Sequence, residues 1–166
     1  VLLAMLTLAI QLPAMVAQRE LGRLVPILAG VLHAVTVIAV LVGGAVTGAI
    51  VWLTLLLAGS AVMISIAAIA RATRGTTAFA RLGGLIGRLP LTPSIFAGSV
   101  LLLVGLPYLG ASLAWRELTE TLGASATDSP GMLTTALGAL PAVVSAGIAF
   151  ALTRAWMLTH FGRMRH

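Results

Sequence analysis

Few side chains in this sequence could carry acid–base chemistry, and each lies within or beside an apolar run. His33 lies in the middle of the run over residues 24–42, and Arg116 and Glu117 follow the run over residues 92–115. The unperturbed pKa of an imidazole is about 6.5, so His33 could transfer protons near neutral pH. A neutral, hydrogen-bonded packing role is the alternative. Arg116 and Glu117 could belong to an ion pathway or anchor a helix end at a membrane surface.

The run that precedes Arg116 is interrupted by the tripeptide Gly105-Leu106-Pro107. In a lipid bilayer, backbone groups that such a break sets free must bond to neighbouring helices or line a polar cavity. Interrupted helices line ion pathways in transporters, although a packed kink has the same sequence signature. The sequence therefore predicts a helix that is broken at Gly105 and Pro107.

Other kinds of chemistry find no support in the sequence. Cysteine is absent, which excludes disulfides and cysteine-ligated clusters. The three histidines and four acidic residues are scattered, without the spacing of a zinc site. No arrangement of nucleophile, base and orienting group is present at a workable spacing. We therefore expect no cofactor, no metal and no catalysis by the chain on its own.

The composition indicates that the elements that position these residues lie in a membrane. The chain of 166 residues is 60% hydrophobic and 8% charged, with a mean hydropathy of +1.12, whereas about a quarter of the residues of a soluble protein are charged. All ten basic residues are arginines that lie between or at the ends of apolar runs. This placement is typical of membrane topology, not of a nucleic-acid-binding face. The expected partners are the lipid bilayer and other integral membrane subunits, and no nucleic acid.

Five apolar runs have lengths near the ~20 residues that cross about 30 Å of hydrocarbon. Gly43 and Gly44 predict a turn between the second run and the third, and Pro141 either kinks the fifth run or marks its start. The prediction is an all-α, polytopic membrane bundle of about five transmembrane helices in one domain over residues 1–166. Because the first residue is Val1, we expect that a native N-terminal part is missing. The runs cover residues 1–17, 24–42, 46–70, 92–115 and 132–158.

The arginines predict the orientation of this bundle. Nine of the ten fall in connections that would share one side of the membrane, and Arg116 alone falls on the other side, beside acidic residues. The positive-inside rule assigns the arginine-rich side to the cytoplasm. We expect the N-terminus outside and the C-terminus in the cytoplasm, in a bacterial plasma membrane. The nine residues are Arg19, Arg23, Arg71, Arg74, Arg81, Arg88, Arg154, Arg163 and Arg165.

The connections themselves are less well defined. Residues 71–90 carry apolar side chains at helical spacing with arginines between them, which fits either a short helix at the membrane surface or an ordered, glycine-rich loop. Residues 123–131 are predicted to form a polar loop. Arg154 lies about one turn inside the end of the fifth run, where its side chain is expected to reach the membrane surface.

Three stretches, in this order along the chain, resemble motifs of a known family. They are QRELGRL at residues 18–24, the segment with GGL, RLPLT and GLPYL at residues 83–109, and TRAWMLTHFG at residues 153–162. Their order and spacing resemble the antiporter-like L, M and N subunits of respiratory complex I and the A and D subunits of Mrp-type Na+/H+ antiporters. Related membrane subunits of hydrogenases are similar. The resemblance covers nearly the whole chain and roughly the second half of the family's fourteen-helix core.

This resemblance implies a membrane subunit of a multisubunit, complex I-like or Mrp-like assembly that translocates protons or cations. Two alternatives remain open: a non-conducting scaffold subunit of such a complex, and a membrane subunit of an inorganic-carbon uptake complex built on the same family. In each case the function belongs to the assembly, and any redox chemistry belongs to other subunits.

The chain departs from the family at the charged positions of the ion pathway. Gly22 stands where the family has a lysine, and Trp115 stands where the broken helix usually ends with lysine or glutamate. Trp52, Leu56 and Ser60 stand at the family's His-x3-His-x3-Lys positions. The resemblance therefore implies a degenerate charged axis. The ion-pathway candidates that remain are His33, Ser60, Arg116 and Glu117.

Overall fold

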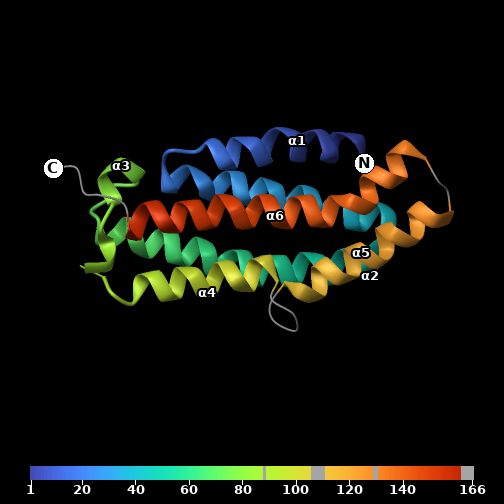
Figure 1. Cartoon of the computed structure of the whole chain (residues 1–166). Helices are drawn as coiled ribbons and strands as arrows, with labels where there is room; N and C mark the ends of the chain where they lie inside the picture. Colours follow the sequence, from blue (N-terminus) through green and yellow to red (C-terminus); the bar gives the residue numbers. More distant parts are fainter. Residues whose placement is uncertain (88, 106–110, 129–130, 162–166) are drawn as a thin grey trace.

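The computed structural model describes residues 1–87, 89–105, 111–128 and 131–161, and this part of the chain forms an elongated bundle of helices (Figure 1). Among the described residues the one β feature is an isolated bridge between Glu20 and Ala78. The predicted all-α class is confirmed. The helices are α1 (Leu2–Ala17), α2 (Leu21–Ala72), α3 (Phe79–Leu82), α4 (Thr92–Val104), α5 (Ser112–Asp128) and α6 (Met132–His160), with a 3-10 turn over Leu85–Gly87.

α2 is a hairpin of two arms. Gly44 interrupts it with φ 79° and ψ −174°, a backbone conformation that glycine adopts without steric penalty. The arms then pack closely against each other: a Cβ atom at Gly59 of the second arm would lie 2.6 Å from Leu32 Cδ1 of the first. The predicted turn at Gly43-Gly44 is confirmed. Away from the turn, the first arm begins three residues before the predicted run, and the second arm ends two residues after it.

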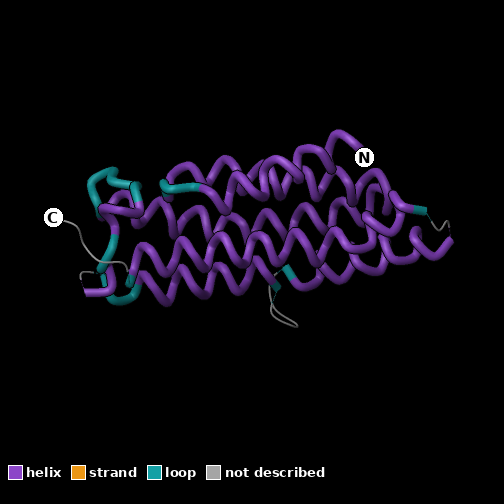
Figure 2. Tube along the Cα trace, turned by 45° about the horizontal axis from the view of Figure 1, so that its top comes forward, coloured by secondary structure: helices purple, strands orange, loops and turns teal. Residues whose placement is uncertain are grey.

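The remaining helices pack around this hairpin. α1 contacts α2 and α6, while α4 and α5 both contact α2. α6 returns along the bundle against α1, α4 and α5. Figures 1 and 2 show the helices running side by side along one axis, with the N-terminus and α3 at opposite ends. Within the described ranges, two helical segments, α2 and residues Thr135–His160 of α6, are long and apolar enough to cross a membrane.

Both the core and the outer surface of the bundle are apolar. Leu28, Val35 and Phe96 are fully buried in the core. Large aliphatic side chains also cover the outside, where Leu3 is 78% exposed and Val46 is 73% exposed. Soluble monomers rarely expose contiguous apolar surface on this scale.

The region after the break requires two corrections. Trp115, Arg116 and Glu117 do not end the fourth helix; they lie in the first two turns of the separate helix α5. α5 also continues to Asp128, so the loop predicted over residues 123–131 is wrong for residues 123–128, which are helical. The physical reason is that Ala114, Leu118 and Leu122 form a fully buried stripe at a spacing of four residues, which holds α5 against the bundle.

The connection between α2 and α4 combines the two structures that its sequence allowed. It contains the short helix α3 and the 3-10 turn, with Phe79, Leu82 and Leu85 buried and Arg81 exposed. Two backbone hydrogen bonds join it to the α1–α2 junction, from Leu21 N to Thr77 O (2.8 Å) and from Phe79 N to Arg19 O (3.0 Å).

Candidate functional site

The predicted break lies between α4 and α5 and is stabilised by hydrogen bonds from both sides. α4 ends at Val104, and Gly105 follows in the left-handed conformation with φ 87° and ψ 75°. Leu106 and Pro107 lie outside the described residues. The chain is helical again from Ser112. The predicted interruption at Gly105 is therefore confirmed.

Two of the last carbonyl groups of α4 accept hydrogen bonds from residues beyond the break, and a third is bonded within the end of the helix. Gly105 N donates to Leu101 O (3.1 Å), and Ala111 N donates to Leu102 O (2.8 Å). The indole Nε1 of Trp115 donates to Leu103 O (2.9 Å). Carbonyl groups at the end of a helix have no partner within that helix, so these bonds compensate for the break.

Gly105 is required both by its backbone conformation and by the space around it. A Cβ atom at this position would lie 2.9 Å from Trp115 Cδ1 and 3.0 Å from Ser112 N. The left-handed region is itself unfavourable for residues with a Cβ atom. Gly105 and Trp115 therefore form one packed unit that closes the break.

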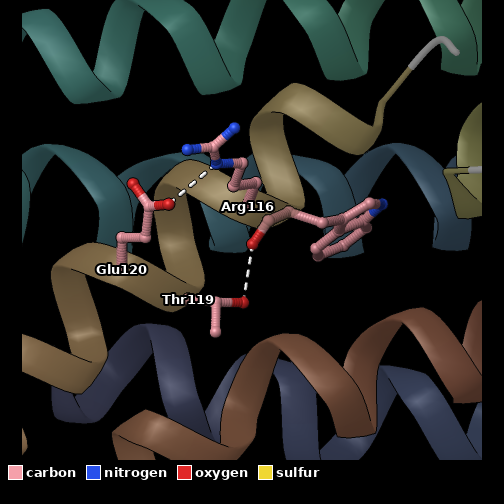
Figure 3. A network of polar contacts seen from close by, with 4 residues as sticks. Arg116, Thr119 and Glu120 are labelled. Atoms are coloured by element: carbon pink, nitrogen blue, oxygen red, sulfur yellow. Dashed lines mark hydrogen bonds and ion pairs between the residues drawn. The ribbon is translucent and has the colours of Figure 1, made fainter. Parts of the chain in front are cut away.

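Arg116 and Glu120 form an exposed ion pair on the surface of α5 (Figure 3). Arg116 Nε donates to Glu120 Oε1 at 2.7 Å. The hydrogen bond to Glu120, together with the charge of that carboxylate, raises the pKa of the Arg116 guanidinium above its usual value. In the same view the hydroxyl of Thr119 donates to the backbone oxygen of Trp115 (2.7 Å).

Glu117 faces the hairpin instead of the surface pair. It is half-buried, and its Oε1 accepts a hydrogen bond from Thr47 Oγ1 at 3.1 Å. Thr47 is buried and lies one turn after the bend of α2. Thr47 could not be selected from local residue patterns, because it lies 70 positions from Glu117 in the chain.

His33 and Ser60 line one groove on the outside of the α2 hairpin. This groove, here called the His33 groove, has a volume of about 170 Å³. Its wall contains Trp52, Leu56 and Ser60, the three positions at which the resemblance implies histidine and lysine. His33 is exposed, and no described residue forms a hydrogen bond with its ring. The Ser60 hydroxyl donates to Leu57 O at 2.8 Å.

His33 also borders a second groove, between α1 and the first arm of α2. This groove has a volume of about 540 Å³ and includes Thr7 and Gln11. The Gln11 side chain packs directly over Gly30, and its Oε1 is buried without a hydrogen-bond partner among the described residues. Sequence reasoning did not select Gln11 as a candidate, since a lone glutamine in an apolar helix gives no spacing signal.

The predicted site residues therefore fall into two regions. His33 and Ser60 share a groove, whereas Glu117 and Arg116 lie near the bend of α2 and point to different sides of α5. Thr47 and Ser60 are 13 residues apart, about 20 Å along the arm at 1.5 Å per residue. The structure does not bring the four candidates together.

Arg154 has a structural role that its position at a helix end did not reveal. Its Nη1 donates to Val16 O (3.0 Å) and to Gln18 O (2.9 Å). Both carbonyl groups belong to the C-terminal end of α1, where a positive charge is favourable. The Arg154 side chain thereby joins α6 to the end of α1.

No group of three or more histidine or acidic side chains in the described part of the chain could hold a metal ion. Comparison of the chain with protein-family models and with curated proteins finds no match in either.

Proposed function

We propose that the chain is an integral membrane, antiporter-like subunit of a multisubunit, complex I-like or Mrp-like assembly, and that this half of the subunit provides no ion path. Its role in such an assembly is that of a packed membrane scaffold. The observation that carries this proposal is the position of Trp115: a buried indole bonded to Leu103 O stands where the resemblance implies an ionisable side chain.

The membrane assignment is supported by the lengths and surfaces of the helices. The bend at Gly44 divides α2 into two apolar arms, and the first of them, 23 residues from Leu21 to Gly43, extends about 34 Å at 1.5 Å per residue. α4 alone has 13 residues and is too short, so a fourth crossing needs the first turns of α5. The exposed aliphatic side chains suit contact with lipid.

The scaffold role is supported by the other positions of the implied pathway. A Cβ atom at Gly22 would lie 3.3 Å from Thr77 Cγ2, so the Thr77 side chain would have to shift slightly to admit a lysine there. Trp52 and Leu56 make one wall of the His33 groove apolar. A proton relay needs titratable groups within hydrogen-bond reach of one another or of water, and the titratable candidates His33 and Glu117 lie in separate regions of the bundle.

One observation favours the second candidate function, ion conduction. Glu117 is a half-buried carboxylate bonded to Thr47, and it lies in the second turn of α5, the helix that follows the break. A carboxylate beside a helix break is an arrangement that ion pathways use.

A flux experiment separates the two functions. The full chain is placed in proteoliposomes with a pH-sensitive dye inside, and a pH gradient is applied. We expect flux no higher than in protein-free vesicles, and no change with His33→Ala or Glu117→Gln. Flux that Glu117→Gln abolishes would establish conduction and contradict the scaffold role.

A second experiment tests the assembly. The tagged chain is expressed in its native cells, extracted in a mild detergent and purified, and the co-purifying proteins are identified, with untagged cells as the control. We expect other integral membrane subunits of one complex. Their identity distinguishes a complex I-like or Mrp-like assembly from an inorganic-carbon uptake complex. Recovery of the chain alone would count against the proposal.

A further inference from the structure

A cleft at the arginine-rich end of the bundle is lined by hydroxyl, guanidinium and leucine side chains. It lies between the end of α2, the helix α3 and the 3-10 turn, and it has a volume of about 280 Å³. We name it the Arg81 cleft. Its main lining residues are Thr73, Thr76, Arg81, Leu82, Leu85 and Leu89.

Hydrogen bonds connect the walls of the cleft to one another and to the rest of the bundle. The Thr73 hydroxyl contacts Ile69 O and Thr76 O, each at 2.8 Å. The segment that leads into α3 bonds to the α1–α2 junction through Leu21 N and Phe79 N. Leu82 and Leu85 are buried and form an apolar side.

The charge at this cleft is positive and uncompensated. Arg81 is exposed, and no acidic side chain among the described residues pairs with it. Arg71 and Arg74 are exposed at the same end. The carboxylate of Glu20, which lies on this side, is in an ion pair with Arg23 (2.9 Å).

We propose that the Arg81 cleft binds the phosphate of an anionic phospholipid, with Arg81 and the Thr76 hydroxyl on the phosphate and the leucine side against the first acyl carbons. Arginine forms strong hydrogen bonds to phosphate oxygens, and basic pockets at the cytoplasmic ends of membrane helices suit anionic headgroups. The inference rests on the proposed membrane location but not on the scaffold role.

The experiment measures retained lipid on the full chain. The protein is reconstituted in nanodiscs with equal amounts of phosphatidylglycerol and phosphatidylcholine, then extracted in an uncharged detergent, and bound lipid is quantified by mass spectrometry. Arg81→Gln is compared with Arg23→Gln, which removes one positive charge from the same end but not from the cleft. Arg81→Lys tests whether charge alone suffices, and helix content by circular dichroism controls for folding.

We expect Arg81→Gln to reduce retained phosphatidylglycerol about fivefold, the effect of one arginine near an anionic headgroup. Arg23→Gln should change it less than about twofold, and phosphatidylcholine should not depend on either variant. Equal loss with both variants would indicate diffuse attraction and overturn the site. Competition of inorganic phosphate with the lipid at low millimolar concentration would assign the cleft to free phosphate instead.

These outcomes are distinct from failure of the proposed function. A chain that is found in the membrane but retains phosphatidylglycerol independently of Arg81 leaves the membrane assignment standing and removes the cleft as a site. A chain that does not enter nanodiscs would contradict both the membrane assignment and the lipid site in the Arg81 cleft.

Discussion

Trp115 and Gly105 decide the local structure of the break between α4 and α5. The indole N–H of Trp115 bonds to Leu103 O, and the absence of a Cβ atom at Gly105 lets Trp115 approach. A tryptophan that donates its N–H in an apolar interior satisfies a carbonyl group that would otherwise be buried without a partner. The same side chain fixes the shape of the break.

Gly105→Ala tests this unit directly. The substitution places a Cβ atom in the left-handed region and against Trp115, so we expect the free energy of unfolding to fall by about 1–3 kcal/mol. It is measured by denaturant titration of the detergent-solubilised chain, followed by circular dichroism.

Gly98→Ala in α4 is the matched control. A Cβ atom there meets no atom within 4 Å, and alanine favours the helix, so stability should stay equal or rise. A loss of stability at Gly98 as large as that at Gly105 would show that the break is not the cause.

At the scale of the elements, α1 is held by a charged residue of α6. In the described part of the chain, the Arg154 side chain of α6 donates hydrogen bonds to two carbonyl groups at the C-terminal end of α1. The two bonds satisfy backbone groups that have no partner within α1. Arg154 therefore attaches the C-terminal end of α1 to α6.

Arg154→Gln should lower the free energy of unfolding by about 1.5–3 kcal/mol, since hydrogen bonds of a charged donor to two part-buried carbonyl groups are lost. Arg154→Lys should restore part of it. The readout is the same denaturant titration, combined with limited proteolysis at the α1–α2 junction, which should become faster in Arg154→Gln.

Arg116→Gln serves as the comparison. It removes an arginine whose ion pair with Glu120 is exposed, and such pairs contribute little. We expect no measurable change in stability. If Arg116→Gln were as damaging as Arg154→Gln, net charge rather than the bonds to α1 would explain both.

At the scale of the whole molecule, the described arginines are distributed unequally between the two ends of the bundle. Arg19 and Arg81 lie at the end that carries α3, and Arg116 lies toward the opposite end, beside the bend of α2. Arg88, Arg163 and Arg165 lie outside the described residues. The distribution supports a cytoplasmic assignment of the α3 end.

Cysteine labelling tests this orientation, because the chain has no cysteine of its own. Ala72→Cys and Glu120→Cys place single thiols at the two ends. In intact cells an impermeant maleimide should label Glu120→Cys and not Ala72→Cys, and disruption of the membrane should expose both. Labelling of Ala72→Cys in intact cells would reverse the orientation, and labelling of both would contradict a membrane-spanning bundle.

The sequence by itself determined the features that depend on composition and local residue type. These are the all-α class, the turn at Gly43-Gly44 and the interruption at Gly105. Glycine fixes such points locally, because its backbone reaches conformations that other residues avoid. The extent of α5 could not be predicted, since polar residues after Glu120 suggested a loop while burial of Leu122 keeps the segment helical.

Only the tertiary structure decided which distant groups meet. Thr47 with Glu117, Trp115 with Leu103 and Arg154 with Val16 are all contacts across helices. They depend on how the helices are rotated and how far they slide along one another. Residue spacing within a single helix does not encode these quantities, because many apolar faces of similar composition could pack together. The separation of His33 from Glu117 follows from the same packing.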